Sequence, residues 1–245
     1  MTDSVKTLSD MLLLDDSVSD DLLATLVAIA GSAQALAKII ANGPLGARLD
    51  KEVGENSDGD AQKLLDVLAD ELFADALSAV PVRWYASEER PEIDLLNTEG
   101  SLAVAIDPLD GSSNIDANIS IGTIFSVFDA KEGGWESFCR AGREQIAAGY
   151  AVYGPQTCFV VATANHVYQF ILHDGEFVSV SDELRIPDET REFAINASNY
   201  RHWAQPVRAF VDDCIAGEDG PNGENLNMRW VASLVAEAHR ILKRG

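Results

Sequence analysis

Apolar residues recur at steps of three and four in two early segments, 21–42 and 62–79, which is the period of an amphipathic helix. Gly43 and Pro44 follow the first segment and predict its end. A polar, glycine-containing stretch separates the two, so we expect two helices joined by a loop. The apolar positions are Leu22, Leu26, Ile29, Ala33, Leu36 and Ile40 in the first helix and Leu65, Leu68, Leu72 and Ala76 in the second.

The pattern then changes to short runs rich in aromatic and β-branched residues, which predict strands at 82–86, 101–106, 121–128, 148–154, 158–163 and 167–172. The tetrapeptide HDGE at 173–176 predicts a hairpin into FVSV. A further strand is expected at 193–196, and helices at 201–216 and 229–243. Helices, then a multi-stranded sheet, then helices favour a layered α/β or α+β architecture.

Composition narrows the class of protein. The 245 residues include 18 basic and 40 acidic ones, for a formal charge of −22, and 47% hydrophobic residues provide for a core. Such a charge repels nucleic acids and anionic membranes, so neither is an expected partner. Cys139, Cys158 and Cys214 are odd in number and lack metal-ligand spacing. No signal peptide and no apolar stretch of membrane-spanning length is expected, so we predict a soluble cytoplasmic protein with reduced thiols.

The candidate chemistry centres on Ile106–Asp116, IDPLDGSSNID, directly after the apolar run LAVAI. Asp-Pro fits a type I turn, and that alone would explain the short pattern. A second acid pair, Glu88 and Glu89, follows the strand at 82–86. Acids at the ends of buried strands lie at the rim of a sheet, where clefts form, and they repel each other unless cations neutralise them. Carboxylate and carbonyl oxygens suit Mg²⁺ or Mn²⁺, and two such ions can activate a phosphoryl group and water.

Glycine and serine complete the motif. Gly111 allows close backbone approach, and the amides of Gly111, Ser112 and Ser113 can form an anion nest at a helix start. Asp66 and Asp70 lie one helical turn apart and can face the same side. The sequence therefore predicts a site for hard cations and a phosphate.

Several motifs together resemble the class I fructose-1,6-bisphosphatases, within the magnesium-dependent, lithium-sensitive sugar and inositol phosphatases. They are DPLDGSSNID followed by ISIGTIFSVF, with GDAQKLLDVLADEL, SEE, AAGYAVYG, AIN and RWVASLVAEAHRIL in family order. The resemblance implies the layered α-β-α-β sugar-phosphatase fold, with N-terminal helices packed on a mixed sheet. It also implies an N-terminal domain over 1–185, and the beginning of a substrate domain over 186–245.

The resemblance further implies roles for individual residues and two or more Mg²⁺ ions per site, with Mn²⁺ as an alternative. The implied metal ligands are Glu88, Asp107, Asp110 and the carbonyl of Leu109. The acids that position or deprotonate water are Asp60, Asp66 and Glu89. Residues Asp110, Gly111, Ser112 and Ser113 match the 1-phosphate loop, and Asn196 the 6-phosphate pocket. Arg229 matches the arginine that reaches the neighbouring subunit's 6-phosphate, so a dimer or tetramer is expected.

Simpler interpretations apply to three of these residues and to Asp70. Asp60 could be the N-cap of the helix that follows it. Asp70 has no family role and reads as a solvated helix acid. Asn196 could bond only to its own backbone, and Arg229 could be a surface arginine at a helix start.

The sequence also departs from the family pattern. Trp230 stands where a tyrosine is usual. The AMP site of animal members uses basic and hydroxyl residues, whereas Asp20-Asp21, Ser101-Leu102 and Asp129 stand here, so we expect no AMP inhibition through that site. Family members also continue past Gly245 with a further metal-ligating glutamate and with substrate lysines.

The expected activity is hydrolysis of the 1-phosphate of fructose 1,6-bisphosphate in gluconeogenesis or Calvin-cycle metabolism. Sedoheptulose 1,7-bisphosphate is a close second substrate, and inositol monophosphate a less favoured one. The alternative is a truncated homologue with weak metal binding and little or no turnover.

Overall fold

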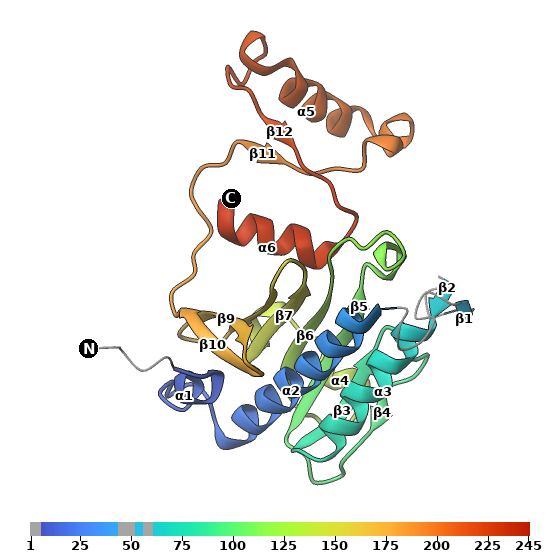
Figure 1. The fold of residues 1–245 in the computed structure, drawn as a ribbon, viewed down its shortest axis with the longest axis vertical. Helices are drawn as coiled ribbons and strands as arrows, with labels where there is room; N and C mark the ends of the chain where they lie inside the picture. Colours follow the sequence, from blue (N-terminus) through green and yellow to red (C-terminus); the bar gives the residue numbers. More distant parts are fainter. Residues whose placement is uncertain (1–5, 44–51, 56–60) are drawn as a thin grey trace.

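An eight-stranded mixed sheet forms the centre of the molecule (Figure 1). The computed structural model describes residues 6–43, 52–55 and 61–245. Neighbouring strands follow the order β10-β9-β8-β7-β6-β5-β3-β4, in which only β3 and β5 run parallel. Sequential strands pair antiparallel from β5 to β10; the connections from β7 to β10 are short, whereas residues 111–120 and 130–146 form longer connections before them.

Most strands of the sheet agree to within one or two residues with the predicted runs, but β5 extends past the predicted end and β4 was not predicted. The strands are β3 (Val82–Ser87), β4 (Asp94–Leu95), β5 (Leu102–Asp110), β6 (Ile121–Asp129), β7 (Ala147–Tyr153), β8 (Thr157–Ala162), β9 (Val167–His173) and β10 (Glu176–Ser181). Two small sheets lie outside it, made of β1 (Glu52–Glu55) with β2 (Ala61–Lys63) and of β11 (Glu192–Phe193) with β12 (Asn227–Met228).

The helices surround this sheet. Their bounds are α1 (Leu8–Leu12), α2 (Asp20–Asn42), α3 (Leu64–Ser78), α4 (Gly134–Phe138), α5 (Gln205–Ala216) and α6 (Leu234–Arg244), with 3₁₀ turns at η2 (Ser112–Asn114), η3 (Gly142–Glu144), η4 (Ala197–His202) and η5 (Gly217–Asp219). Both early helices are confirmed, and α2 begins after Ser19, whose side chain accepts a hydrogen bond from the Leu22 amide.

The two faces of the sheet carry different helices, as alternation along β6 shows. Phe125 and Val127 point into the core cluster that contains the buried residues of α2 and α3. A side chain on Gly122 would instead meet Val235 of α6, so the alternate positions face α6. Figure 1 shows α2 and α3 on one side of the sheet and α6 on the other, with α5 beyond α6. The expected layered fold with N-terminal helices on a mixed sheet is confirmed.

Helix α2 corrects the expectation that no apolar stretch is long enough to span a membrane. Its 23 residues include a window of mean hydropathy 1.7, so by length and composition it could cross a membrane. Nine of its residues are buried, and the apolar ones among them, including Leu26, Ile29 and Leu36, join the core cluster. A core helix packed on a sheet satisfies the same length and hydropathy criteria, and this packing accounts for its apolar character.

Three further element boundaries differ from expectation. Helix α6 begins at Leu234 rather than 229, and α5 begins at Gln205 after the 3₁₀ turn at 197–202. The expected strand at 193–196 is limited to β11, which pairs in parallel with β12. The structure also contains the short elements α1, α4, β4 and β12, which are too brief to show a hydrophobic period.

Candidate active site

The Asp-Pro motif lies inside β5 and does not end it. Pairing with β6 shifts between Asp107, which faces Ile124, and Asp110, which faces Gly122. The Leu109 amide donates to Asp107 Oδ1 at 3.0 Å. The expectation that the strand ends at residue 106 with a type I turn is therefore wrong, because an irregular pairing bends the strand and carries both acids forward.

The buried hydroxyl groups of Thr123 and Tyr153 stabilise this bend in β5. Thr123 Oγ1 donates to the Pro108 carbonyl at 2.9 Å and also lies 2.9 Å from the Tyr153 hydroxyl. A hydroxyl carries one hydrogen, so Tyr153 is the donor to Thr123. Burial raises the pKa of Tyr153, which keeps that proton in place. This chain of hydrogen bonds fixes the backbone between the two acids.

Glu88 and Asp107 form the acidic centre of the site. The Glu88 amide donates to the Ile106 carbonyl at 3.2 Å, which places the turn after β3 beside the end of the apolar part of β5. Burial, then the nearby carboxylates of Glu88 and Asp110, raises the pKa of Asp107 to about 8. Carboxylates held this close favour either a shared proton or a bound cation.

Asp110 is close enough to act on Asp107, but its own carboxylate is turned to the start of α6. It accepts hydrogen bonds from Ser233 Oγ at 2.8 Å and from the amides of Leu234 at 3.2 Å and Val235 at 2.9 Å. A carboxylate at a helix N-terminus satisfies amides that have no partner within the helix. Asp110 therefore joins the motif to α6.

Asn114 makes a second connection between the same two segments. Its Nδ2 donates to the carbonyls of Val231 at 2.9 Å and Ala232 at 3.3 Å. Gly111 has φ +79°, and a side chain there would approach Ser233. The loop of Gly111, Ser112 and Ser113 therefore leads into η2 while packed against the residues that begin α6.

The remaining expected site residues lie in several places. Asp66 is buried in the first turn of α3, and Asp60 lies outside the described residues. Glu89 follows β3, and its amide donates to Ser87 Oγ at 3.2 Å. Leu109 is buried within β5. Asn196 is the N-cap of η4, where its Oδ1 accepts from the Ser198 amide and hydroxyl, so its contacts are local but include a side chain as well as the backbone.

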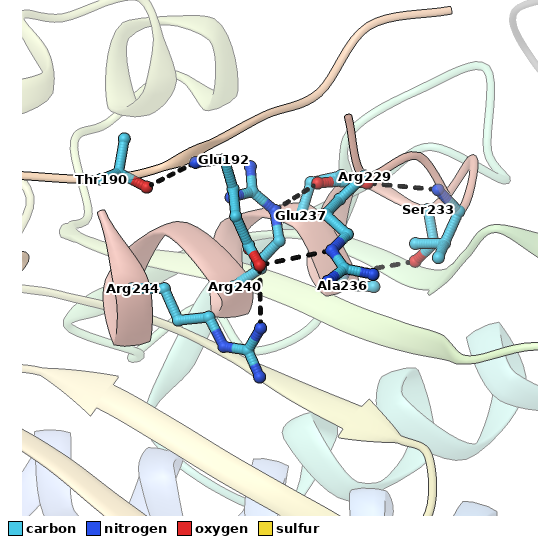
Figure 2. A network of polar contacts seen from close by, with 9 residues as sticks. Thr190, Glu192, Arg229, Ser233, Ala236, Glu237, Arg240 and Arg244 are labelled. Atoms are coloured by element: carbon cyan, nitrogen blue, oxygen red, sulfur yellow. Dashed lines mark hydrogen bonds and ion pairs between the residues drawn. The ribbon is translucent and has the colours of Figure 1, made fainter. Parts of the chain in front are cut away.

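Arg229 lies after β12 and not at the start of a helix. Its Nε is 3.3 Å from Glu192 Oε1, and Arg240 and Arg244 contact the same glutamate at 3.5 and 3.0 Å. Figure 2 shows the three arginines converging on Glu192. Burial works to raise the pKa of Glu192, but hydrogen bonds from Arg244 and Arg229 outweigh it and lower that pKa. Half of the Arg229 side chain stays exposed, as does the following Trp230.

The sequence analysis missed one group of residues beside the turn that carries Glu88 and Glu89. Asp70 is buried, and it accepts from the Tyr85 hydroxyl at 2.9 Å and from Arg90 Nε at 2.6 Å. The interpretation of Asp70 as a solvated helix acid is therefore wrong. Its spacing from Asp66 on the helix was a signal that it could face the interior.

The donor chemistry of the site fits a hard divalent cation. Glu88 and Asp107 offer carboxylate oxygens with no nitrogen or sulfur donor, which is the ligand type of Mg²⁺ and Mn²⁺. Among the side chains that the structure describes, no three His, Cys, Asp or Glu residues gather as a preformed metal site. The orientation of Asp110 toward α6 agrees with that result. Glu88 and Asp107 also line part of an open cavity of about 720 Å³, whose lining is otherwise mostly apolar and includes Ile124, Val160 and Leu242.

A mixed sheet between two helical layers, with paired acids beside a glycine-serine loop, defines the sugar-phosphatase class of fold. Residues 6–182 match the family model for the fructose-1-6-bisphosphatase N-terminal domain, and residues 186–245 match that for its C-terminal domain. The chain belongs to the class 1 fructose-1,6-bisphosphatase family.

Individual relatives support this assignment. The class 1 fructose-1,6-bisphosphatase of Bradyrhizobium sp. is 69% identical over 245 residues, which are 100% of this chain and 72% of that protein. The class 1 enzyme of Paracoccus denitrificans is 52% identical over 94% of this chain and 69% of its own. The holo crystal structure of Leishmania major fructose-1,6-bisphosphatase is 27% identical, with TM-score 0.91 over 99% of this chain and 77% of that one.

Proposed function

We propose that this protein hydrolyses the 1-phosphate of fructose 1,6-bisphosphate, giving fructose 6-phosphate and inorganic phosphate. The observation that carries the proposal is the pair of interacting carboxylates, Glu88 and Asp107, which lie near Asp110, the residue that begins the loop to Ser113. Membership of a family of metal-dependent phosphatases supports the same reaction.

The cation site is the first part of the proposal. Glu88, Asp107 and the Leu109 carbonyl would hold Mg²⁺, or Mn²⁺ in its place, in two or more positions, and Asp110 would contribute an oxygen left over from its bonds to α6. When bound, the ions supply Lewis-acid polarisation of the phosphoryl group and of the leaving oxygen. Neutralising cations also relieve the repulsion from Glu88 and Asp110 that, after burial, raises the pKa of Asp107.

The other residues bind the phosphate and the water. The backbone amides of Gly111, Ser112 and Ser113 would donate to the phosphate oxygens, since the positive φ of Gly111 turns the chain sharply there. Asp66 and Glu89 would hold the attacking water and accept its proton, with Asp60 assisting. In-line attack then breaks the phosphorus–oxygen bond, and the sugar oxygen leaves with a proton from solvent.

Substrate recognition involves the segment 186–245, which we propose is part of the substrate domain that follows residues 1–185. Asn196 and Arg229 would bind the 6-phosphate. The exposed Arg229 could reach a neighbouring copy once its contact with Glu192 opens, so we propose a homo-oligomer, a dimer or tetramer. The charge of −22 argues against nucleic-acid or membrane partners and agrees with a cytoplasmic enzyme.

Phosphate release tests the reaction. The purified chain is incubated with fructose 1,6-bisphosphate, sedoheptulose 1,7-bisphosphate or inositol 1-phosphate, with Mg²⁺ or with a chelator. We expect Mg²⁺-dependent release that is fastest with fructose 1,6-bisphosphate. Faster release from sedoheptulose 1,7-bisphosphate would make that ester the assigned substrate in place of fructose 1,6-bisphosphate. No release from any of the three would contradict the proposed function.

A further inference from the structure

We propose that Asp70 is a positioning residue, which holds the turn of Glu88 and Glu89 in the geometry that binds a divalent cation. This inference rests on the cation site of the proposed function. Asp70 lies on α3 and does not belong to the acidic turn, so it would act through Tyr85 and Arg90.

The contacts of Asp70 reach the turn from both sides. Tyr85 lies in β3, three residues before Glu88, and its hydroxyl donates a hydrogen bond to Asp70 Oδ1 at 2.9 Å. Arg90 directly follows Glu89 and donates Nε to Asp70 Oδ2 at 2.6 Å. Each carboxylate oxygen of Asp70 therefore holds one flank of the four-residue segment that carries both acids.

Arg90 is fixed by several partners at once. Its Nη1 bonds to Asp94, and its guanidinium lies 5.2 Å from the centre of the Tyr85 ring. Its amide donates to the Ser87 carbonyl at 3.2 Å, which closes the turn around Glu88 and Glu89. A planar guanidinium held by two carboxylates and an aromatic face has little rotational freedom, so the backbone that bears it is also restrained.

Burial makes these contacts strong. The Asp70 residue is 6% exposed, and Tyr85 is fully buried. Burial, then the Asp70 carboxylate, raises the pKa of Tyr85, so the phenol remains a donor. Burial works to lower the pKa of Arg90, but Asp70 and Asp94 outweigh it and raise that pKa. The charge on Asp70 is thus balanced by Arg90, which directly follows Glu88 and Glu89 in the sequence.

The same contacts control the local charge. Arg90 is a cation next to two carboxylates that would bind another cation. Asp70 and Asp94 accept from Nε and Nη1 of its guanidinium and so engage these two donors. Without the Asp70 charge, Arg90 gains freedom to compete for Glu88 or Glu89. Loss of Asp70 therefore weakens the cation site both by loosening the turn and by releasing a competing charge.

Manganese binding tests the inference without requiring turnover. The full chain is titrated with Mn²⁺, and free Mn²⁺ is measured by electron paramagnetic resonance. Residues that orient ligands from outside the coordination shell change metal affinity by about 10–100-fold. We expect Asp70→Asn to weaken Mn²⁺ binding within that range. Arg90→Lys keeps the positive charge but loses the planar guanidinium with its several donors, and we expect it to weaken Mn²⁺ binding as well.

Two controls on the same helix separate positioning from general stability. Asp75→Asn removes an exposed acid from α3 and should leave the Mn²⁺ dissociation constant within about twofold. Leu77→Val opens space at a fully buried position and should lower the melting temperature without changing that constant. The inference is overturned if Asp70→Asn and Arg90→Lys bind Mn²⁺ like the wild type. It is also overturned if Leu77→Val weakens binding as much as Asp70→Asn for the same loss of melting temperature.

The outcomes distinguish this inference from the proposed reaction. A wild-type chain that binds Mn²⁺ but releases no phosphate contradicts the reaction alone, and the variants still decide the role of Asp70. A wild-type chain that binds no Mn²⁺ overturns both. Weaker binding in Asp70→Asn and Arg90→Lys, with both controls unchanged, supports the positioning role.

Discussion

Asp110 serves two structural demands with one carboxylate. It lies in the acidic centre, and it also accepts the Ser233 hydroxyl and two amides at the start of α6. A carboxylate has about four acceptor positions, so three hydrogen bonds leave room for one further interaction. The capping role and the proposed cation role can therefore be separated by substitution.

We predict different results for two substitutions at Asp110. Asp110→Asn keeps one acceptor oxygen for the helix but removes the charge, so it should lower turnover by at least about 100-fold while shifting stability little. Asp110→Ala removes the cap as well and should cost a further 1–2 kcal/mol, roughly, in the free energy of unfolding. Phosphate release and urea unfolding measure the two effects. Unchanged turnover in Asp110→Asn would contradict the cation role.

Ala232 occupies a backbone conformation that favours glycine, with φ +56°, immediately before the Ser233 cap of α6. A left-handed conformation costs a residue with a side chain about 1–2 kcal/mol. We predict that Ala232→Gly raises the free energy of unfolding by about 0.5–1 kcal/mol, since glycine also loses more freedom on folding. Ala236→Gly, inside α6, should instead lower it by about 1 kcal/mol. Urea unfolding compares the two, and a destabilised Ala232→Gly would show that the alanine conformation carries no strain.

The chemistry of individual acids could be read from the sequence, but their partners could not. Asp107 and Glu88 lie together as the motif predicts. Asp70 shows why the rest was hidden: its partner Arg90 lies 20 positions away, beyond the end of a different element. A helical acid appears solvated until the fold brings an arginine and a tyrosine to it. The same holds for Thr123 and Tyr153, whose hydroxyls matter because Pro108 lies across the sheet from them.

Some boundaries of helices and strands can be predicted from the local sequence, and others depend on contacts made in the fold. The strands from β5 to β10 are predictable because burial on a sheet selects aromatic and β-branched residues along whole runs. The start of α6 is Leu234 and not 229 as predicted. Ser233 caps the helix by accepting from the Ala236 amide, and Asp110, more than 100 positions earlier, accepts from the Ser233 hydroxyl. Hydrophobic periodicity alone does not detect a boundary set by a cap residue and a distant side chain.

Asp15 connects the segment between α1 and α2 to the hairpin of β8 and β9. It is buried, and its carboxylate accepts hydrogen bonds from Ser17, Thr163 and Asn165, as well as from Tyr168. Burial works to raise the pKa of Asp15, but these hydrogen bonds, those of Ser17 first, outweigh it and hold the pKa below its usual range. The folded state therefore favours the ionised form more than the unfolded state does.

This difference predicts how stability depends on pH. The contribution of Asp15 is complete above the pKa of the unfolded chain, near 4, and is lost as the pH falls toward the lower folded value. Asp15→Asn should lower the free energy of unfolding at pH 7 by about 1.5–3 kcal/mol. The wild type and the variant should converge as the pH falls below about 4. Urea unfolding across this range measures it, with exposed Asp16→Asn as the control. Parallel curves would contradict the assignment.

Distant parts of the chain meet at the position where animal relatives were expected to bind AMP. Asp21, near the start of α2, accepts a hydrogen bond from Ser101, directly before β5. Leu102 pairs with Asp129 at the end of β6, and the Ala130 amide donates to the Ser101 carbonyl at 2.8 Å. The fold thus gathers the three substituted positions into one acidic corner.

Repulsion at this corner leads to the last prediction. The phosphate of AMP would approach Asp20, Asp21 and Asp129, and like charges in contact disfavour binding. Arg140 is one nearby cation, and it donates to the Asp129 carbonyl and pairs with Glu144, so its charge is already matched. We expect millimolar AMP to leave phosphate release from fructose 1,6-bisphosphate unchanged, in the wild type and in Asp129→Ala alike. Tight inhibition of the wild type that Asp129→Ala abolishes would show that a nucleotide binds here despite the carboxylates.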